Sequence, residues 1–412
     1  MTSIMLIMLL TFLVASCNCA VEFSSRPRNF SIEIFFFTQR EGRLDHFVMS
    51  PFCIWSVMTG AYAGAHGDTN TQIQRATGIL KNHTLFLKRL KDLSNTLFQS
   101  TPNGVELSST TFLFQDKDVS VLQSYKTTLN RSYKAQLRIL DFQDTLETAN
   151  QANRVIQNIF PTVSNVFHAD DFAKASLILG NVIYFRGILK TPFNVSYTTE
   201  EIIYDEKNKS IGSISMMHQK GKLPYSNFET MNSYILELPY GNDEKFCMLV
   251  IFPYPGVRPI DVYRNLDKIY IKDILTKLET DFKNNGSQEI DVKMPRFRIR
   301  TSMPLRKPLN DMGVFDAFEP DLGRFEDISR DGLYIHSVEH KAEIIFAESE
   351  TVVFATTPGY FDNQPFSSNL KAQQPFIFFL IEKPTATIIF AGIYSRHRYL
   401  NDLNSRILFN DD

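Results

Sequence analysis

The chain has 412 residues, with 43 Lys and Arg against 45 Asp and Glu and a formal net charge of -2. Because neither sign dominates, there is no global field to attract nucleic acid or an anionic membrane, and neither is an expected partner. With 43% hydrophobic residues, including 35 Phe, the chain has the composition of a globular protein with an aromatic core.

The first 20 residues have the pattern of a secretory signal peptide. An apolar stretch from Ile4 to Val14 is followed by small residues that end at Cys19 and Ala20. The stretch is too short to span a membrane, so a cleaved signal peptide is favoured over an N-terminal anchor. We therefore expect a secreted, extracellular protein with a signal peptide at residues 1–20, one domain at residues 21–397 and a polar tail at residues 398–412.

Six Asn-x-Ser/Thr sequons agree with passage through the secretory pathway, because this motif accepts N-linked glycans. The predicted glycosylation sites are Asn29, Asn82, Asn130, Asn194, Asn208 and Asn285. Any of these short motifs can also arise by chance, so modification of several is expected rather than of all.

Two cysteines lie outside the predicted signal peptide. Cys53 and Cys247 both have apolar neighbours, in SPFCIW and EKFCMLVIF. Buried free thiols are the favoured interpretation, and a single disulfide is the alternative.

Helical periodicity dominates the first half of the chain. Apolar residues recur there at three- and four-residue spacing, as on the buried face of a helix. The predicted helices are Phe30 to Arg40, Ile54 to Gly64, Thr69 to Ile79, Thr84 to Phe98, Ser120 to Leu129 and Thr145 to Phe160.

Segments rich in Ile, Val, Phe and Tyr dominate the second half and predict strands. They are Ala175 to Phe185, Ser213 to Met217, Tyr234 to Leu238, Phe246 to Phe252, Glu289 to Met294, Leu333 to Val338, Ala342 to Phe346 and Phe376 to Phe390. The polar GNDEK turn before Phe246 predicts a hairpin. Helices first and strands later predict an α+β fold.

One long segment fits neither pattern. Residues Ala347 to Leu370 (AESETVVFATTPGYFDNQPFSSNL) join a strand-like run to the apolar block that begins at Pro375. A segment of this length without structure of its own is usually functional or disordered. Linkers are rich in charge, Gly or Ser, whereas this segment contains TVVF and GYF. We therefore interpret it as an exposed loop that acts as bait for a partner.

Catalytic and metal-binding motifs do not occur in the sequence. There is no G-x-S-x-G, HExxH or CxxC, so no enzymatic activity, metal or cofactor is predicted. His336 and His340 are four residues apart, but their strand-like context favours a structural role over a metal site.

Seven blocks of the sequence, in order, resemble the serpin family of serine protease inhibitors. They are Ser50 to Ile73, Asn181 to Phe193, Ser215 to Gly221, Tyr234 to Pro253, Met294 to Phe318, Leu333 to Thr351 and Gln373 to Gly392. The resemblance implies an α+β fold with helices mainly from the N-terminal half around a large central β-sheet, further sheets and an exposed reactive loop. It also implies a suicide-substrate inhibitor, whose cleaved loop inserts into the sheet as a strand and traps the protease.

The resemblance assigns a shutter beneath the opening sheet to Ser50, Cys53, Asn181 and His340. Cys53 replaces the serine that is usual in the family. Because a thiol is a weak hydrogen-bond donor, this departure raises the question of how the network is completed.

By the same resemblance, Glu348 opens the hinge of the loop, Glu350 stands where inhibitory members usually have Gly, and Thr351 begins the inserting half. Strand alternation places Thr351, Val353, Ala355 and Thr357 on one face, and Val352, Phe354 and Thr356 on the other. If the first set faces the core, insertion is sterically possible, with the bulky Phe354 on the solvent side.

Other features of the loop oppose inhibition. Glu350 removes a flexible glycine, the run from Val352 to Phe354 replaces the small residues of fast-inserting members, and Pro358 interrupts strand pairing. The alternative function is therefore a non-inhibitory serpin-fold binding or carrier protein.

The loop contains no Lys or Arg from Phe346 to Leu370, which argues against trypsin-like targets because their specificity pocket binds a basic side chain. Counting as in the family places the scissile bond between Gln364 and Pro365, although proline after the bond obstructs cleavage. Phe366–Ser367 is preferred, and Tyr360 and Phe361 are alternatives. All three suit a chymotrypsin-like hydrophobic pocket, and the expected target is a chymotrypsin- or elastase-like protease rather than a trypsin-like one.

The expected partner is an extracellular serine protease, and the protein is expected to be a monomer. Lys88, Arg89 and Lys91 lie on a predicted helix in a region where some serpins bind polyanions. A solvated helix face is favoured there over a weak polyanion contact.

Overall fold

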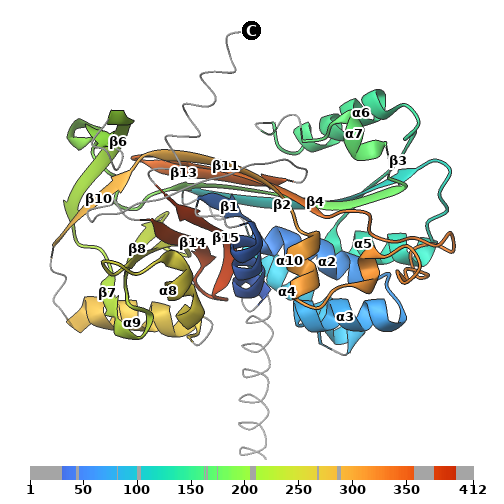
Figure 1. Ribbon diagram of the computed structural model, residues 1–412, viewed down its shortest axis with the longest axis horizontal. Helices are drawn as coiled ribbons and strands as arrows, with labels where there is room; N and C mark the ends of the chain where they lie inside the picture. The colour runs from blue at the N-terminus through green and yellow to red at the C-terminus, as the bar shows by residue number, and fades with distance from the viewer. Residues whose placement is uncertain are drawn as a thin grey trace, which may run out of the picture.

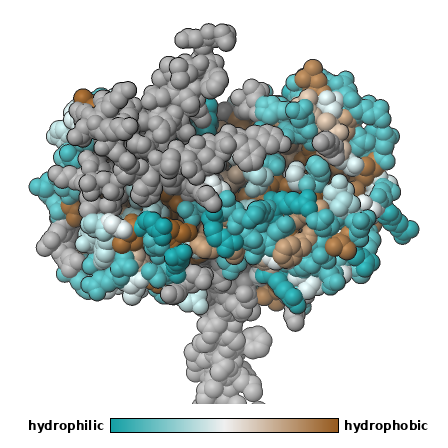
Figure 2. Space-filling model, in the orientation of Figure 1, coloured by the Kyte–Doolittle hydropathy of each residue, from teal (hydrophilic) through white to brown (hydrophobic). Residues whose placement is uncertain are grey.

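The structure is a computed structural model that describes residues 30–42, 46–80, 82–99, 104–161, 163, 166–173, 175–204, 210–266, 269–284, 289–356 and 375–395. These residues form three β-sheets with helices packed on them, an α+β arrangement (Figure 1). Hydrophilic residues cover most of the described surface in the view of Figure 2, with scattered hydrophobic patches.

The helices begin with one over residues 30–42. The others are α2 (Pro51–Tyr62), α3 (Gly67–Thr77), α4 (His83–Leu97), α5 (Gln123–Tyr133), α6 (Thr145–Gln157), α7 (Ala169–Phe172), α8 (Pro259–Leu266), α9 (Ile271–Asn284) and α10 (Arg306–Asp311). Short 3-10 turns are η1 (Val195–Tyr197), η2 (Glu229–Met231) and η3 (Asp316–Phe318). Across the described residues, no helix is both long enough and apolar enough to cross a bilayer.

The central sheet has six strands. Their spatial order is β11 (Phe297–Pro304), β12 (Glu339–Phe346), β13 (Glu350–Thr356), β4 (Leu177–Ile188), β2 (Val105–Asp116) and β3 (Gln136–Leu140). Only the β2–β3 pair is parallel. The strand order shows that β13, which follows β12 in the chain, separates β12 from β4.

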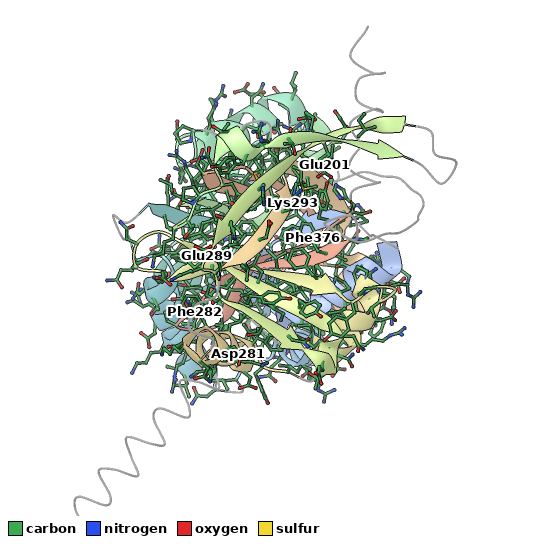
Figure 3. All side chains as sticks on the ribbon, turned by 90° about the vertical axis from the view of Figure 1, so that its left-hand side faces the viewer. Glu201, Asp281, Phe282, Glu289, Lys293 and Phe376 are labelled. Carbon is green, nitrogen blue, oxygen red and sulfur yellow. The ribbon has the colours of Figure 1, made fainter. Side chains whose placement is uncertain are left out.

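Two further sheets complete the fold. The second sheet has the order β1 (Phe47–Met49), β15 (Thr387–Tyr394), β14 (Phe376–Glu382), β9 (Phe246–Pro253), β8 (Ser233–Tyr240) and β7 (Tyr225–Phe228). The third has the order β10 (Ile290–Pro295), β6 (Ser210–Gly221) and β5 (Thr199–Tyr204). Figure 3 shows the molecule from the side of the third sheet. Lys293 is labelled on β10, Glu201 on β5 and Phe376 at the start of β14.

Helix α2 lies at the centre of the fold, and its sequence explains its start. Ser50 caps the helix by accepting a hydrogen bond from the Cys53 amide at 3.1 Å, and Pro51 follows at the first helical position, where no amide hydrogen is needed. Most residues of α2 are buried, including Trp55. The apolar periodicity of α2 is therefore weak. The sequence predicts a helix from Ile54, three residues after the observed start at Pro51.

The two faces of the central sheet are covered differently. The main hydrophobic core lies on the side of α2, whereas a smaller cluster lies under α6 and α7 on the opposite side (Figure 1). The smaller cluster is rich in Phe and includes Phe112 and Phe114 of β2 and Tyr184 of β4. The second half of β2 and the middle of β4 are thus shielded from water on both faces, whereas Glu106 and Arg186 remain exposed.

The structure confirms the α+β class and the predicted hairpin, in which β8 pairs with β9 through Tyr240 and Phe246. Two strand predictions are wrong. Residues Leu333 to Val338 form no strand, and Phe376 to Phe390 is a hairpin of β14 and β15 that turns at Ala386, where φ is 54°. The sequence also gives no prediction for β2 or α9.

Candidate functional site: the hinge of the loop and the shutter beneath it

The first part of the predicted loop is an interior strand of the central sheet. Val353 of β13 pairs with Ile344 of β12 on one side and with Phe185 of β4 on the other. The composition of β13, ETVVFAT, explains this placement, because β-branched and aromatic residues pack well on a pleated surface. The backbone of Ala355 continues the pairing, opposite Ala342 and Ile183.

The face of β13 that points to the main core carries Thr351 and Val353, both with no exposed surface. These are the residues that strand alternation assigns to one face. The Thr351 hydroxyl is hydrogen-bonded to the Tyr240 hydroxyl at 2.7 Å. Burial raises the pKa of Tyr240, so the phenol stays protonated and can donate to Thr351.

From the sequence, Phe354 is expected on the solvent side of the sheet. The structure does not place it there. It is half-buried and packs, with Val352, against the Phe-rich cluster under α6 and α7. The expectation was wrong because it treated the outer face of the sheet as open to water, whereas α6 and α7 cover that face at β2 and β4 (Figure 1). An inserted Phe354 therefore contributes to packing.

The turn from β12 into β13 is held by the segment that follows β4. The amide of Ala347 donates to the carbonyl of Glu350 at 3.1 Å within the turn. From outside the turn, Leu189 donates to the Ser349 carbonyl at 2.9 Å and Phe193 to the Glu348 carbonyl at 2.8 Å. These bonds fix the point at which the chain reverses.

The Glu348 carboxylate anchors this turn through its side chain. Glu348 is 5% exposed, is paired with Arg296 and accepts a hydrogen bond from the Thr198 hydroxyl at 2.8 Å. Burial alone would raise the pKa of Glu348, but the bonds from Arg296 and Thr198 outweigh burial and hold it below its usual range. Glu348 is therefore an ionised anchor at the entrance to β13.

Glu350 opens β13 and points to the outer face of the sheet. Its carboxylate forms an ion pair with Arg186 of β4 at 2.8 Å, and both side chains are partly exposed. A glutamate at this position thus has a partner across the strand pair, although an exposed pair contributes little to stability.

The four shutter residues lie together at the junction of α2 with the sheets. The Ser50 amide donates to His340 Nε2 at 2.9 Å, and the Ser50 hydroxyl donates to the Ile389 carbonyl at 2.7 Å. The Cys53 thiol donates to the backbone carbonyl of Asn181 at 3.1 Å, so the thiol has a partner despite being a weak donor.

The side chain of Asn181 points toward β2 and away from His340. It accepts from the Ser109 hydroxyl at 3.1 Å and donates to the Thr111 hydroxyl at 3.1 Å. Burial lowers the pKa of His340 to about 3, so the imidazole is neutral and Nε2 can accept from Ser50.

Several predicted residues lie outside the described part of the chain. These are Thr357, the cleavage candidates Tyr360, Phe361, Gln364, Pro365, Phe366 and Ser367, the signal peptide, the tail, and the sequons at Asn29, Asn208 and Asn285. Asn82, Asn130 and Asn194 are exposed. Cys53 and Cys247 are buried free thiols, as favoured from the sequence.

Sequence reasoning missed four side chains that contact the hinge: Arg186, Thr198, Tyr240 and Arg296. They come from distant segments, and nothing local marks them. One local pattern could have indicated Arg296. Arg296, Arg298 and Arg300 alternate with apolar residues, as the outward-facing residues of a strand do. Arg298 and Arg300 both pair with the buried Glu343 of β12, in the register that this alternation predicts.

Residues 25–396 match the family described as serpin (serine protease inhibitor). The chain belongs to the serpin family. Members of this family are inhibitors of proteases and not enzymes.

Individual relatives are distant. The serpin is 29% identical to human "Antithrombin-III" over 84% of this chain and 76% of that one, and 26% identical to horse "Leukocyte elastase inhibitor" over 91% and 99%. The crystal structure of the thermophilic serpin Tengpin in the latent state superimposes with a TM-score of 0.75 at 21% identity, covering 91% of this chain and 97% of that one. This likeness shows the serpin fold.

Proposed function

We propose that this serpin inhibits serine proteases by offering its loop as a substrate and inserting the cut loop into the central sheet. The observation that carries the proposal is β13. Residues Glu350 to Thr356 pair with both β12 and β4, and Thr351 and Val353 are fully buried. The start of the loop is therefore sterically compatible with the sheet interior, which is what trapping requires.

The chemistry needs no catalytic group from the serpin. The serine of the protease attacks the scissile carbonyl, the downstream segment leaves as a free amine, and an acyl-enzyme forms. If the loop inserts before water hydrolyses this ester, the protease is carried along and cannot complete its cycle. Insertion thus competes with deacylation.

The proposed targets are extracellular proteases with a chymotrypsin- or elastase-like pocket. The loop from Phe346 to Leu370 has no basic residue but contains Tyr360, Phe361 and Phe366. Phe366–Ser367 is the preferred bond. Secretion, by way of the signal peptide at residues 1–20, and glycosylation of the sequons belong to the same proposal.

A non-inhibitory binding or carrier role is the second candidate, and one observation favours it. The chain is uncut, yet residues up to Thr356 are already paired in the sheet. A loop held at this point has less freedom to reach a protease, and part of its insertion has already taken place.

Incubation with chymotrypsin, elastase and trypsin, followed by denaturing gels, separates the two roles. Inhibition predicts a covalent complex with chymotrypsin or elastase, little complex with trypsin, and a higher melting temperature after loop cleavage. Clean cleavage by all three proteases without complex, and without a rise in melting temperature, would exclude the inhibitory role. Mass spectrometry of the released peptide identifies the bond.

A further inference from the structure

A row of aromatic rings crosses one face of the second sheet. It begins at Tyr394 of β15, whose ring stacks on that of Phe376 of β14 with centroids 5.0 Å apart. The ring of Phe376 lies 5.6 Å from that of Phe252 of β9, and Tyr234 of β8 is the register partner of Phe252. On β7, Tyr225 stacks on Tyr234 at 5.6 Å. The row thus links β15, the last described strand, to the edge strand β7.

This row is buried at one end and open at the other. Tyr394 and Phe376, the latter labelled in Figure 3, have no exposed surface, whereas Tyr234 is 36% and Tyr225 is 39% exposed. Tyr254 extends the open end, with its ring centroid 4.9 Å from that of Tyr234. Tyr225, Tyr234 and Tyr254 together form a surface, the tyrosine face. Grouped and partly exposed aromatic rings are typical of binding surfaces.

Helix α9 packs on the other face of β7. Phe228 of that strand is buried, and the Lys277 ammonium of α9 lies 5.5 Å from the centre of its ring. Strand alternation places Tyr225 and Asn227 on the side that is turned away from α9. The Asn227 side chain accepts a hydrogen bond from the Tyr254 hydroxyl, which fixes that ring against the strand. The tyrosine face is therefore an ordered surface that α9 does not cover.

The segment that follows β15 has a sequence pattern that matches this surface. Residues 396–412 read RHRYLNDLNSRILFNDD. The segment is polar on balance, but some of its apolar residues have the spacing of one face of a helix. These residues are Tyr399, Leu400, Leu403 and Ile407. Arg396 and Arg398 precede them, and guanidinium groups are attracted to the faces of tyrosine rings. The segment thus carries both kinds of group that an aromatic surface binds.

This segment is also long enough to reach the tyrosine face. It starts beside the buried end of the row, because Ser395 directly follows Tyr394. The strand order β15, β14, β9, β8 and β7 puts four strand spacings, about 19 Å, between the two ends of the row. Eight residues of extended chain span about 26 Å, and a helix of twelve residues spans about 18 Å. Residues 396–407 can therefore lie along the whole row.

We propose that residues 396–412 dock on the tyrosine face of their own chain. The apolar residues of the segment lie against Tyr225 and Tyr234, and one of its arginines lies over a tyrosine ring. Docking removes from water the aromatic surface that the row leaves exposed. Glu229, one residue beyond β7, is exposed, forms no ion pair within the described residues and is a partner for Arg406. The proposal stands independently of the proposed inhibitory function.

Hydrogen–deuterium exchange of the full chain, measured by mass spectrometry, tests the docking. Backbone amides of residues 399–409 should exchange about tenfold more slowly than in the free peptide of residues 396–412. Leu403→Asp places a charge on the docked side of the segment and should abolish this protection. Asn401→Asp is the matched control, because it adds the same charge on the opposite side of the helical pattern, and it should leave the protection unchanged.

A second pair of variants tests the surface itself. Tyr234→Ser removes the central ring of the tyrosine face and should also abolish the protection of residues 399–409. Tyr334→Ser is its matched control, because Tyr334 is likewise an exposed tyrosine, at 39%, but lies beside Gly323 in the segment before β12. If Tyr234→Ser does not fold, as judged by circular dichroism, the comparison of Leu403→Asp with Asn401→Asp still decides, since both changes lie outside the sheets.

Trypsin cleavage after Arg398 and Arg406 gives a second readout, and it should be faster in Leu403→Asp and Tyr234→Ser than in their controls. Exchange of residues 399–409 at the rate of the free peptide would overturn the proposal. So would equal effects within either pair of variants. Protection that rises with protein concentration would also overturn it, because the segment would then be docked on a second copy of the chain.

Discussion

Replacing Thr351 by arginine tests whether trapping depends on the buried face of β13. Thr351 has no exposed surface, and its hydroxyl is bonded to Tyr240. A guanidinium there would be buried, at an effective cost of several kcal/mol. Loss of the threonine hydroxyl would also leave the Tyr240 hydroxyl unpaired, which costs about 1–3 kcal/mol more. Because this cost also displaces β13 from the sheet of the uncut chain, insertion after cleavage would have to start again at residue 351 and would be opposed there.

The assay compares the covalent complex with the cleaved, uncomplexed serpin on denaturing gels after reaction with chymotrypsin. If about 4 kcal/mol of the penalty is felt in the rate-limiting insertion step, insertion slows roughly a thousandfold, so deacylation should win and cleavage should continue without complex. Ser349→Arg, in the exposed turn two residues earlier, is the matched control and should still form complex. Trapping by Thr351→Arg at the level of the unchanged protein would refute the reasoning about β13.

Four further substitutions at three positions probe the shutter, the outer face and the hinge. Burial holds the pKa of His340 at about 3, below the ordinary 6.5, so its stabilising contribution is complete above pH 6.5 and is lost as the pH falls. Between about pH 7.5 and pH 5.0 the loss is about 2 kcal/mol, and urea unfolding of His340→Gln should lack this part of the pH dependence. Phe354→Ala should lower the free energy of unfolding of the cleaved form by about 2 kcal/mol, half the value for a fully buried phenylalanine, and an unchanged urea midpoint would contradict its packing under α6. Glu350→Gln should change stability by less than about 1 kcal/mol, because the pair with Arg186 is partly exposed. Glu350→Gly should increase the fraction of covalent complex on gels, whereas an equal increase with Glu350→Gln would show that the charge, and not the backbone, limits insertion.

The sequence was sufficient for the features that depend on local pattern. Period-two alternation in β13 assigns Thr351 and Val353 to one face, and the structure buries both. Polar turn residues between two apolar runs predict the β8–β9 hairpin. The seven ordered blocks resemble the serpin family and so predict its fold.

Features that depend on distant segments could not be predicted in this way. Strand β2 has Ser and Thr in its first half, so its sequence lacks the apolar character of the other central strands, yet it pairs with β4 along its whole length. The ionised anchor at Glu348 depends on Arg296 and Thr198, which lie far away in the chain. Asn181 was assigned to a network with His340, but its side chain turns toward Ser109 and Thr111. Resemblance to the family at a single position does not determine which of two neighbouring hydrogen-bond networks a side-chain amide joins.

The position of Phe354 changes the balance between the two candidate functions. From the sequence, the bulk of the run from Val352 to Phe354 only slows insertion. In the structure, the same bulk gains contacts with the Phe-rich cluster under α6 and α7, so it also stabilises the inserted strand. Because Phe354 is already paired in the sheet of the uncut chain, this packing stabilises the uncut chain as well as the cleaved product, and it adds no barrier to the insertion that remains after cleavage. Trapping depends on the barrier, since insertion competes with deacylation, whereas the rise in melting temperature after cleavage depends on the product. A cleaved form that is strongly stabilised although little complex forms would therefore identify the insertion that remains after cleavage, and not the packing of Phe354, as the step that decides between inhibitor and substrate.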